Sequence, residues 1–227
     1  VYSNGDLLWR DAALVEPLSR SWNMPRWWVL PASSLHEGVN TVWVRVVGVA
    51  VLDPGLGHLR LGSPAVVADE HDHRLWRQRT AYVITAGLSA AMGCLFLVVW
   101  VMRRKERAYG WYALMSLCWV LYLYTLLATT PWPLPSTLAL SRVNIAAFVL
   151  YTWGFCLFTW RFGGQALPRL EQWLRGLVVL GVSVVLLVPQ SAVVPVFAVV
   201  WVGFVLIFFA NCAQFQWHAW RTREPHH

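Results

Sequence analysis

Five long apolar stretches run through this sequence, and Lys and Arg gather in every second loop between or after them. The basic clusters lie at residues 103–107, 161–175 and 221–223. The two remaining loops, 131–135 and 189–192, contain neither Lys nor Arg. Short cytoplasmic loops retain basic residues because such loops are hard to translocate across a bilayer. The alternation therefore predicts a multi-pass membrane protein with an outward-facing N-terminal segment and a cytoplasmic C-terminus.

The composition excludes an ordinary soluble domain. Hydrophobic residues make up 58% of the 227 residues and charged residues only 13%, which is more apolar surface than a soluble domain of this size can bury. The formal net charge of +7 lies in residues 80–227, because the Arg and the acidic residues of 1–79 cancel. The basicity thus indicates topology and contact with anionic lipid headgroups. Nucleic acid is not an expected partner.

Each apolar stretch has the length of a membrane-spanning helix, since about 20 residues cross the roughly 30 Å hydrocarbon core. The expected spans are residues 80–102, 108–130, 138–160, 172–188 and 193–214, within a helical bundle over 80–220. Residues 221–227 are expected to form a truncated cytoplasmic tail. The chain begins at Val1, inside an expected strand and without a signal peptide, so we expect missing sequence at both ends.

Residues 1–68 are expected to form β structure. Asn4-Gly5 is a strong hairpin signal because both residues tolerate positive φ. Further strands are expected at Trp27–Leu30, Thr41–Leu52 and His58–Leu61, separated by turn residues. These strands are too few to close a sandwich, so the segment is predicted to be part of an all-β, jelly-roll-like extracytoplasmic domain. Residues 69–79 are expected to be a flexible polar linker to the membrane.

The spans contain almost no ionisable residues, which argues against proton-coupled carriers and intramembrane proteases. Arg142 is a charged residue near the outer end of the third span, and Asn144 lies two positions after it. Arg142 either makes an internal contact that holds the bundle in one of two packings or extends to the outer headgroups. Asn211 and Gln214 lie one turn apart on the fifth span and are expected to face a neighbouring helix.

Small residues, including Gly87 and Gly93, line one face of the first span. Such faces allow close helix approach in lipid, either within the bundle or in a homodimer. His71 and His73 lie beside the acidic residues Asp69, Glu70 and Asp72, and we interpret this run as solvated charge rather than a metal site. No nucleophile–base set, phosphate loop or HExxH motif is present. The chain itself is therefore expected to have no catalytic site, no metal and no cofactor.

Two parts of the sequence resemble known families. The stretches NGDLLWRD, PRWWVLPASSLHEGVNTVWVRVVG and PGLGHLRLG are similar to galactose-binding-like jelly-roll modules. The matching positions are Asn4, Gly5, Pro31, Leu35, Gly38, Asn40, Val44, Arg45 and Val46. The stretches RLWRQRT and RRKERAYGWYALMSLCWVLY resemble the bacterial seven-transmembrane receptors with diverse intracellular signalling modules.

These resemblances imply a fragment of an inner-membrane receptor in which five of seven spans are present. They imply a periplasmic carbohydrate ligand, for which Trp27 and Trp43 are candidate stacking residues, although either could instead belong to a core. They also imply a missing cytoplasmic output domain, which is a histidine kinase of a two-component system or otherwise a diguanylate cyclase.

We therefore interpret the chain as the sensor portion of a bacterial signal-transduction protein. The alternative is a transporter or accessory subunit with a periplasmic β domain, which should carry polar residues on several facing helices. A glycan-processing membrane enzyme would need paired carboxylates, and Asp6, Asp11 and Glu16 are too loosely placed to suggest it.

Overall fold

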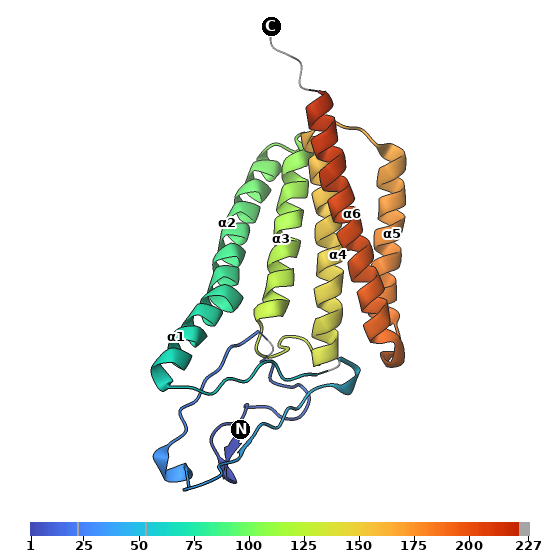
Figure 1. Ribbon diagram of the computed structural model, residues 1–227. Helices are drawn as coiled ribbons and strands as arrows, with labels where there is room; N and C mark the ends of the chain where they lie inside the picture. Colours follow the sequence, from blue (N-terminus) through green and yellow to red (C-terminus); the bar gives the residue numbers. More distant parts are fainter. Residues whose placement is uncertain (22, 53, 223–227) are drawn as a thin grey trace. The chain divides into compact units, whose positions relative to one another are not determined.

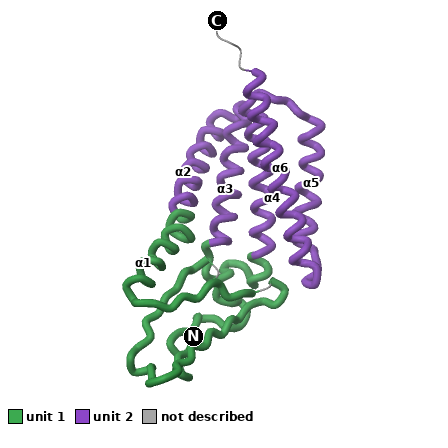
Figure 2. Tube along the Cα trace, in the orientation of Figure 1, with its two compact units in different colours: residues 1–83, 127–140 green, residues 84–126, 141–227 purple. Residues whose placement is uncertain are grey.

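The computed structural model describes residues 1–21, 23–52 and 54–222 (Figure 1). It divides into two compact units, one of residues 1–83 with 127–140 and one of residues 84–126 with 141–227 (Figure 2). The N-terminal segment thus forms a unit with the loop between the second and third expected spans. Most of the expected tail 221–227 lies outside the described residues.

Within the described chain, five helices are long and apolar enough to cross a membrane, and they form a membrane helical bundle. They are α2 (Ala81–Met102), α3 (Arg107–Leu127), α4 (Thr137–Phe162), α5 (Pro168–Leu187) and α6 (Val193–Arg221). α5 begins before the expected residue 172 because Pro168 is accepted at the first helical position, where its missing N–H costs nothing. α6 continues to Arg221 instead of ending at residue 214, and neither Gly nor Pro interrupts residues 204–221.

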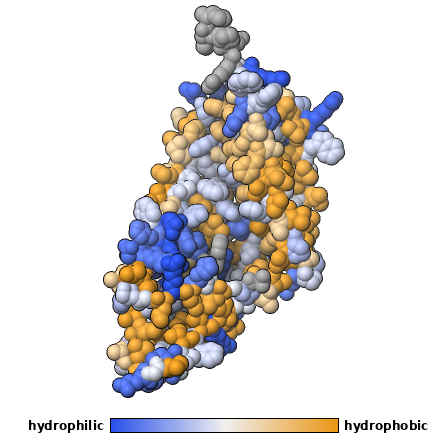
Figure 3. All heavy atoms as spheres, in the orientation of Figure 1, coloured by the Kyte–Doolittle hydropathy of each residue, from blue (hydrophilic) through white to orange (hydrophobic). Residues whose placement is uncertain are grey.

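α4 packs against α3, α5 and α6 (Figure 1). Its Trp153 ring lies 5.2 Å from that of Trp111 on α3, and its Phe155 ring lies 4.6 Å from that of Phe208 on α6. Of the buried apolar side chains in the described residues, α4 supplies more than any other helix. Apolar side chains cover the side of the bundle and polar ones gather near its C-terminal end (Figure 3), as a lipid-embedded bundle requires.

The N-terminal segment contains a small antiparallel sheet in the order β2-β1-β3. Its strands are β1 (Tyr2–Ser3), β2 (Asp6–Leu7) and β3 (Val42–Trp43). The predicted hairpin is confirmed, because Asn4 and Gly5 have φ of 49° and 98° and join β1 to β2. The Asn4 side chain also donates to Ser34 O (2.7 Å) and accepts from Thr41 N (2.9 Å).

The other expected strands are largely absent from the described residues. Trp27–Leu30 and His58–Leu61 are not strands, and within Thr41–Leu52 only β3 is one, while Ala50–Leu52 forms the 3₁₀ turn η2. Extended backbone becomes a strand only where another strand satisfies its N–H and C=O groups. A jelly roll is therefore not confirmed for this segment, which holds one small sheet.

The expected flexible linker at 69–79 is wrong, because these residues are helical. α1 (Pro64–Leu75) passes through a π-helical turn, η3 (Trp76–Thr80), into α2, so one helix runs from Pro64 to Met102. In the turn, Ala81 N–H donates to Trp76 O, five residues back. An ion pair between Arg74 and Glu70 (2.7 Å) stabilises α1 across one turn.

Candidate functional site

The bundle contains a series of polar contacts that connect α4 to its three neighbours. Lipid offers no hydrogen-bond partners, so polar side chains in a bundle bond between helices and fix their relative positions. α4 supplies Arg142, Asn144 and Thr159 to these contacts.

Arg142 binds the C-terminal end of α5. Its Nη2 donates to Val188 O (2.7 Å), and its Nη1 donates to Leu186 O. The last carbonyls of a helix have no intrahelical partner and carry partial negative charge. A guanidinium supplies them with both hydrogen-bond donors and a positive charge. Arg142 thus makes a contact between helices in this structure, and its role in selecting one of two packings stays a prediction.

Asn144 connects α4 to α3. Its Nδ2 donates to Thr125 Oγ1 (2.7 Å), which in turn donates to Tyr122 O (2.7 Å). The Thr125 side chain is fully buried. Deleting either partner would leave a polar atom inside the bundle without its bond.

Asn211 connects α6 to α4 and thus faces a neighbouring helix, as expected. Its Nδ2 donates to Thr159 Oγ1 (2.9 Å), and Thr159 Oγ1 donates to Cys156 O (2.9 Å). Both side chains are buried. Asn211 Oδ1 and the hydroxyl of Thr152 on α4 are buried without hydrogen-bond partners among the described residues.

Gln214 contacts the loop that follows α4. Its Nε2 donates to Gln165 Oε1 (2.8 Å). His218 on α6 lies 3.3 Å from Gly163 O in the same loop, so it contacts protein rather than standing only in solvent. The Arg161–Glu171 ion pair (2.8 Å) joins the last turn of α4 to the first turn of α5, on either side of this loop.

The small-residue face of α2 contacts α3 at Gly93 but not at Gly87. A Cβ placed on Gly93 would lie 3.0 Å from Ser116 Cβ on α3, so Gly93 allows the close approach of these helices. Gly87 faces open space, with nothing within 4 Å of such a Cβ. Gly93 therefore belongs to an intramolecular seam, and Gly87 does not.

The candidate sugar-stacking residues lie in the N-terminal unit. Trp43 is 66% exposed on β3. Trp27 is half-buried, and its ring lies 6.4 Å from the His71 ring. Trp43 therefore presents a free aromatic face, whereas Trp27 shares its face with a histidine.

The remaining chemistry-bearing residues do not converge. Asp11 pairs with Arg26 (3.1 Å), while Asp6 is exposed on β2. His71 contacts Asp72 (3.0 Å). Within the described ranges no group of three His, Cys, Asp or Glu side chains could hold a metal ion.

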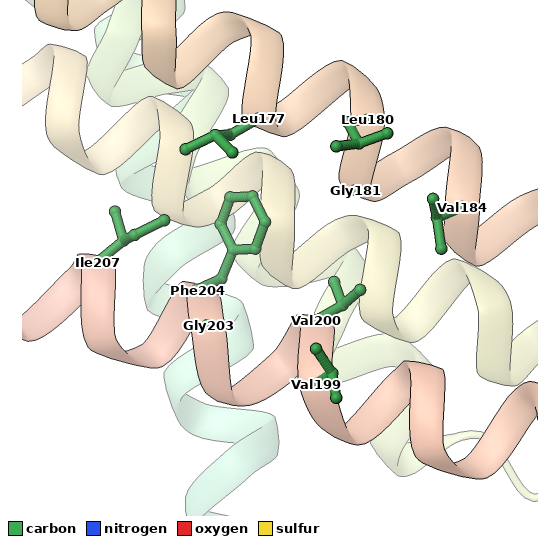
Figure 4. Close-up of a pocket in the computed structure, with 9 residues that line it drawn as sticks. All are labelled: Leu177, Leu180, Gly181, Val184, Val199, Val200, Gly203, Phe204 and Ile207. Atoms are coloured by element: carbon green, nitrogen blue, oxygen red, sulfur yellow. The ribbon is translucent and has the colours of Figure 1, made fainter.

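An apolar groove of about 250 Å³ lies between α5 and α6 (Figure 4). Leu180, Gly181 and Val184 line it from α5, and Val199 and Phe204 line it from α6. A Cβ on Gly181 would lie 3.1 Å from the Phe204 ring, so the ring packs onto the glycine. The groove offers no polar group for catalysis or specific recognition.

Sequence reasoning found Arg142, Asn144, Asn211 and Gln214 but missed their partners. Thr125, Thr159 and Gln165 accept the three side-chain bonds. Isolated hydroxyl residues in apolar helices are the available signal, because such residues bond between helices in lipid.

A family model described as 7TM diverse intracellular signalling matches residues 78–225. This region includes α2 to α6 and therefore every polar contact of α4 described above. No curated protein and no solved structure matches the chain.

Proposed function

This chain belongs to the family of 7TM diverse intracellular signalling proteins, and from that membership we propose that it is the sensing and membrane-spanning part of a bacterial inner-membrane receptor. The matched family is a membrane signalling domain and not itself catalytic. In this proposal residues 1–68 lie in the periplasm and bind a ligand there. The C-terminus of α6 is cytoplasmic and leads to an output domain, a histidine kinase or otherwise a diguanylate cyclase.

The basic residues support this orientation. The basic clusters at residues 103–107, 161–175 and 221–223 lie after α2, around the loop between α4 and α5, and at the end of α6. Arg104 lies 4.1 Å from the Trp100 ring and Arg221 lies 4.7 Å from the Trp217 ring. Tryptophan and arginine favour the headgroup level of a bilayer, so these pairs suit the cytoplasmic surface.

The observation that carries the proposal is the continuous helix from Pro64 to Met102. A helix transmits rotation and translation along its axis, whereas a flexible linker would dissipate them. The π-helical turn at Trp76–Thr80 is a local irregularity of a kind that is frequent at functional sites. A ligand that favours one position of this helix would shift the bundle between packings.

In the bundle, we assign the switch to the contacts of Arg142, Asn144, Asn211 and Gln214. Each is a directional bond between segments far apart in the sequence, so a small helix displacement breaks it rather than stretching it. Bonds of this kind make a packing discrete, which a two-state receptor needs.

For the ligand, we propose a carbohydrate, with Trp43 as the stacking residue and Trp27 as a second contact. A sugar ring presents C–H groups that pack on an exposed aromatic face. The similarity of residues 1–68 to galactose-binding-like modules supports this choice, with these residues as one part of a jelly roll.

The test uses the chain in lipid nanodiscs, with nitroxides at Cys94 on α2 and at Leu177→Cys on α5, which are both exposed, and with Cys212→Ala. The probes are galactose, glucose, N-acetylglucosamine and their linear tetrasaccharides. At least one should shift the α2–α5 distance distribution.

Trp43→Ala should abolish the shift, whereas Trp220→Ala, which removes an exposed tryptophan from α6, should preserve it. The proposal is overturned if no probe changes the distribution, or if a sugar quenches tryptophan fluorescence while the distribution stays fixed.

A further inference from the structure

Residues 16–20 hold both ends of the loop that joins α3 to α4. Glu16 Oε2 accepts hydrogen bonds from Thr137 N (3.3 Å) and Thr137 Oγ1 (3.0 Å), at the first residue of α4. The same oxygen accepts from Leu18 N (3.2 Å). A carboxylate at a helix N-terminus meets unpaired N–H groups and the positive end of the helix dipole.

Arg20 makes the corresponding contacts at the other end of the loop. Its backbone N donates to Thr129 O (2.7 Å), and its Nη1 donates to Ala128 O (3.4 Å). α3 ends at Leu127, so these carbonyls follow its last turn directly. A guanidinium there complements the negative end of the dipole.

The loop side of the contact is packed, whereas the Glu16 side chain itself is exposed. Leu18, which lies between the two charged residues, is 7% exposed, and Thr137 is 8% exposed. Pro131 in the loop is also buried. Burial of Thr137 makes loss of the hydrogen bonds that it donates to Glu16 costly.

We infer that Glu16 and Arg20 are positioning residues that couple the N-terminal segment to the spacing of α3 and α4, by a route separate from the α1–α2 helix. The segment 16–20 places Glu16 at the first residue of α4 and Arg20 at the carbonyls that follow α3. A movement of the segment therefore moves both helix ends or breaks these bonds. Along the chain, Thr125 precedes the loop and Asn144 follows it, so the interhelical bond between them lies on the same two helices.

This inference gives the proposed receptor a second input into its bundle, and its meaning for signalling rests on that proposal. The positional claim can be tested without any ligand. The test uses the chain in nanodiscs and measures hydrogen exchange in peptides covering residues 128–140. It also measures the distance between nitroxides at Leu121→Cys on α3 and Leu180→Cys on α5, both exposed positions, in a Cys94→Ser, Cys212→Ala background.

Glu16→Ala should speed exchange in the loop about tenfold, the factor for loss of one hydrogen bond to a charged group, and should broaden the α3–α5 distances. Glu16→Gln keeps an acceptor without the charge and should give a smaller effect. Thr137→Val, which removes the hydroxyl at the other partner, should act less than additively with Glu16→Ala. Glu37→Ala, at an exposed position in the same segment, is the matched control and should change neither measurement.

Two outcomes overturn the inference. Unchanged exchange in Glu16→Ala would show that the carboxylate does not hold the loop. Faster exchange with an unchanged α3–α5 distribution would show that the contact is local and positions no helix. If a saccharide still shifts the α2–α5 distance, these outcomes leave the receptor proposal intact. If no saccharide shifts it but Glu16→Ala changes both exchange and the α3–α5 distances, the positioning role stands and the sensor proposal fails.

Discussion

Asn144 on α4 donates a hydrogen bond of 2.7 Å to the fully buried hydroxyl of Thr125 on α3. The bond joins two spans that the loop 128–136 separates in sequence, and the ends of this loop are held by Glu16 and Arg20. A polar contact in the bundle and a contact of the N-terminal segment thus act on the same pair of helices.

Breaking the Asn144–Thr125 bond should destabilise the bundle by about 1 kcal/mol, because interhelical hydrogen bonds in membranes contribute about that much. Thr125→Val and Asn144→Leu should each show this loss in the free energy of unfolding, measured by steric trapping in bicelles. The double variant should cost less than the sum of the two, since the second substitution removes a group whose interhelical bond is already lost. Strict additivity would contradict a direct bond.

Replacing Arg142 should loosen the C-terminal end of α5. Arg142→Met leaves the carbonyls of Leu186 and Val188 without their donor and should cost about 2 kcal/mol, while Arg142→Lys restores one donor and should cost about half as much. The measurement is the free energy of unfolding together with hydrogen exchange at residues 189–193. Arg175→Met, at an exposed position on α5, is the control, and an equal loss in that variant would show a general charge effect.

The two glycines of α2 should respond differently to added volume. Gly93→Leu forces a side chain against Ser116 and should lower stability by about 1–3 kcal/mol, the usual cost of overpacking. Gly87→Leu should leave the stability of the monomer unchanged because its site is open. Chemical cross-linking in membranes tests whether the Gly87 face forms a homodimer. Loss of a cross-linked dimer in Gly87→Leu alone would place the homodimer face there.

Interrupting the helix between Pro64 and Met102 should uncouple the N-terminal segment from the bundle. A GGSGGSG insertion after Asp72 should abolish the saccharide-induced change in the α2–α5 distance. An insertion of the same length with the helical sequence AEAAAKA adds about two turns and should preserve it. Equal responses from both insertions would count against transmission along this helix.

The orientation can be tested with single cysteines in a background that lacks Cys94 and Cys212. Arg104→Cys should resist a membrane-impermeant maleimide in intact spheroplasts and react after lysis, because its basic loop is expected to be cytoplasmic. Val39→Cys, at a position that is 93% exposed, should react before lysis. Labelling of residue 104 in intact cells would reverse the topology and remove the basis of the receptor proposal.

Local features were predicted well because they depend on short segments. A helix in lipid satisfies its backbone within its own turns, so an apolar run of sufficient length specifies it without reference to the rest of the chain. The Asn4-Gly5 hairpin is equally local, since two residues with positive φ fix the turn. The linker was predicted wrongly because polar composition was taken for flexibility, although Pro64 at a helix start and the Glu70–Arg74 pair favour a helix.

Hydropathy and turn chemistry alone predicted that the chain crosses a membrane and where its five membrane-spanning helices lie, with the polar side chains that they carry. The folded chain was needed to show that Arg142 binds the end of α5, that Asn211 binds Thr159, and that Glu16 reaches the start of α4. The physical reason is that hydropathy and turn chemistry act between near neighbours in the chain. The partner of a polar side chain is chosen by packing between segments that are 46 to 121 residues apart in these contacts.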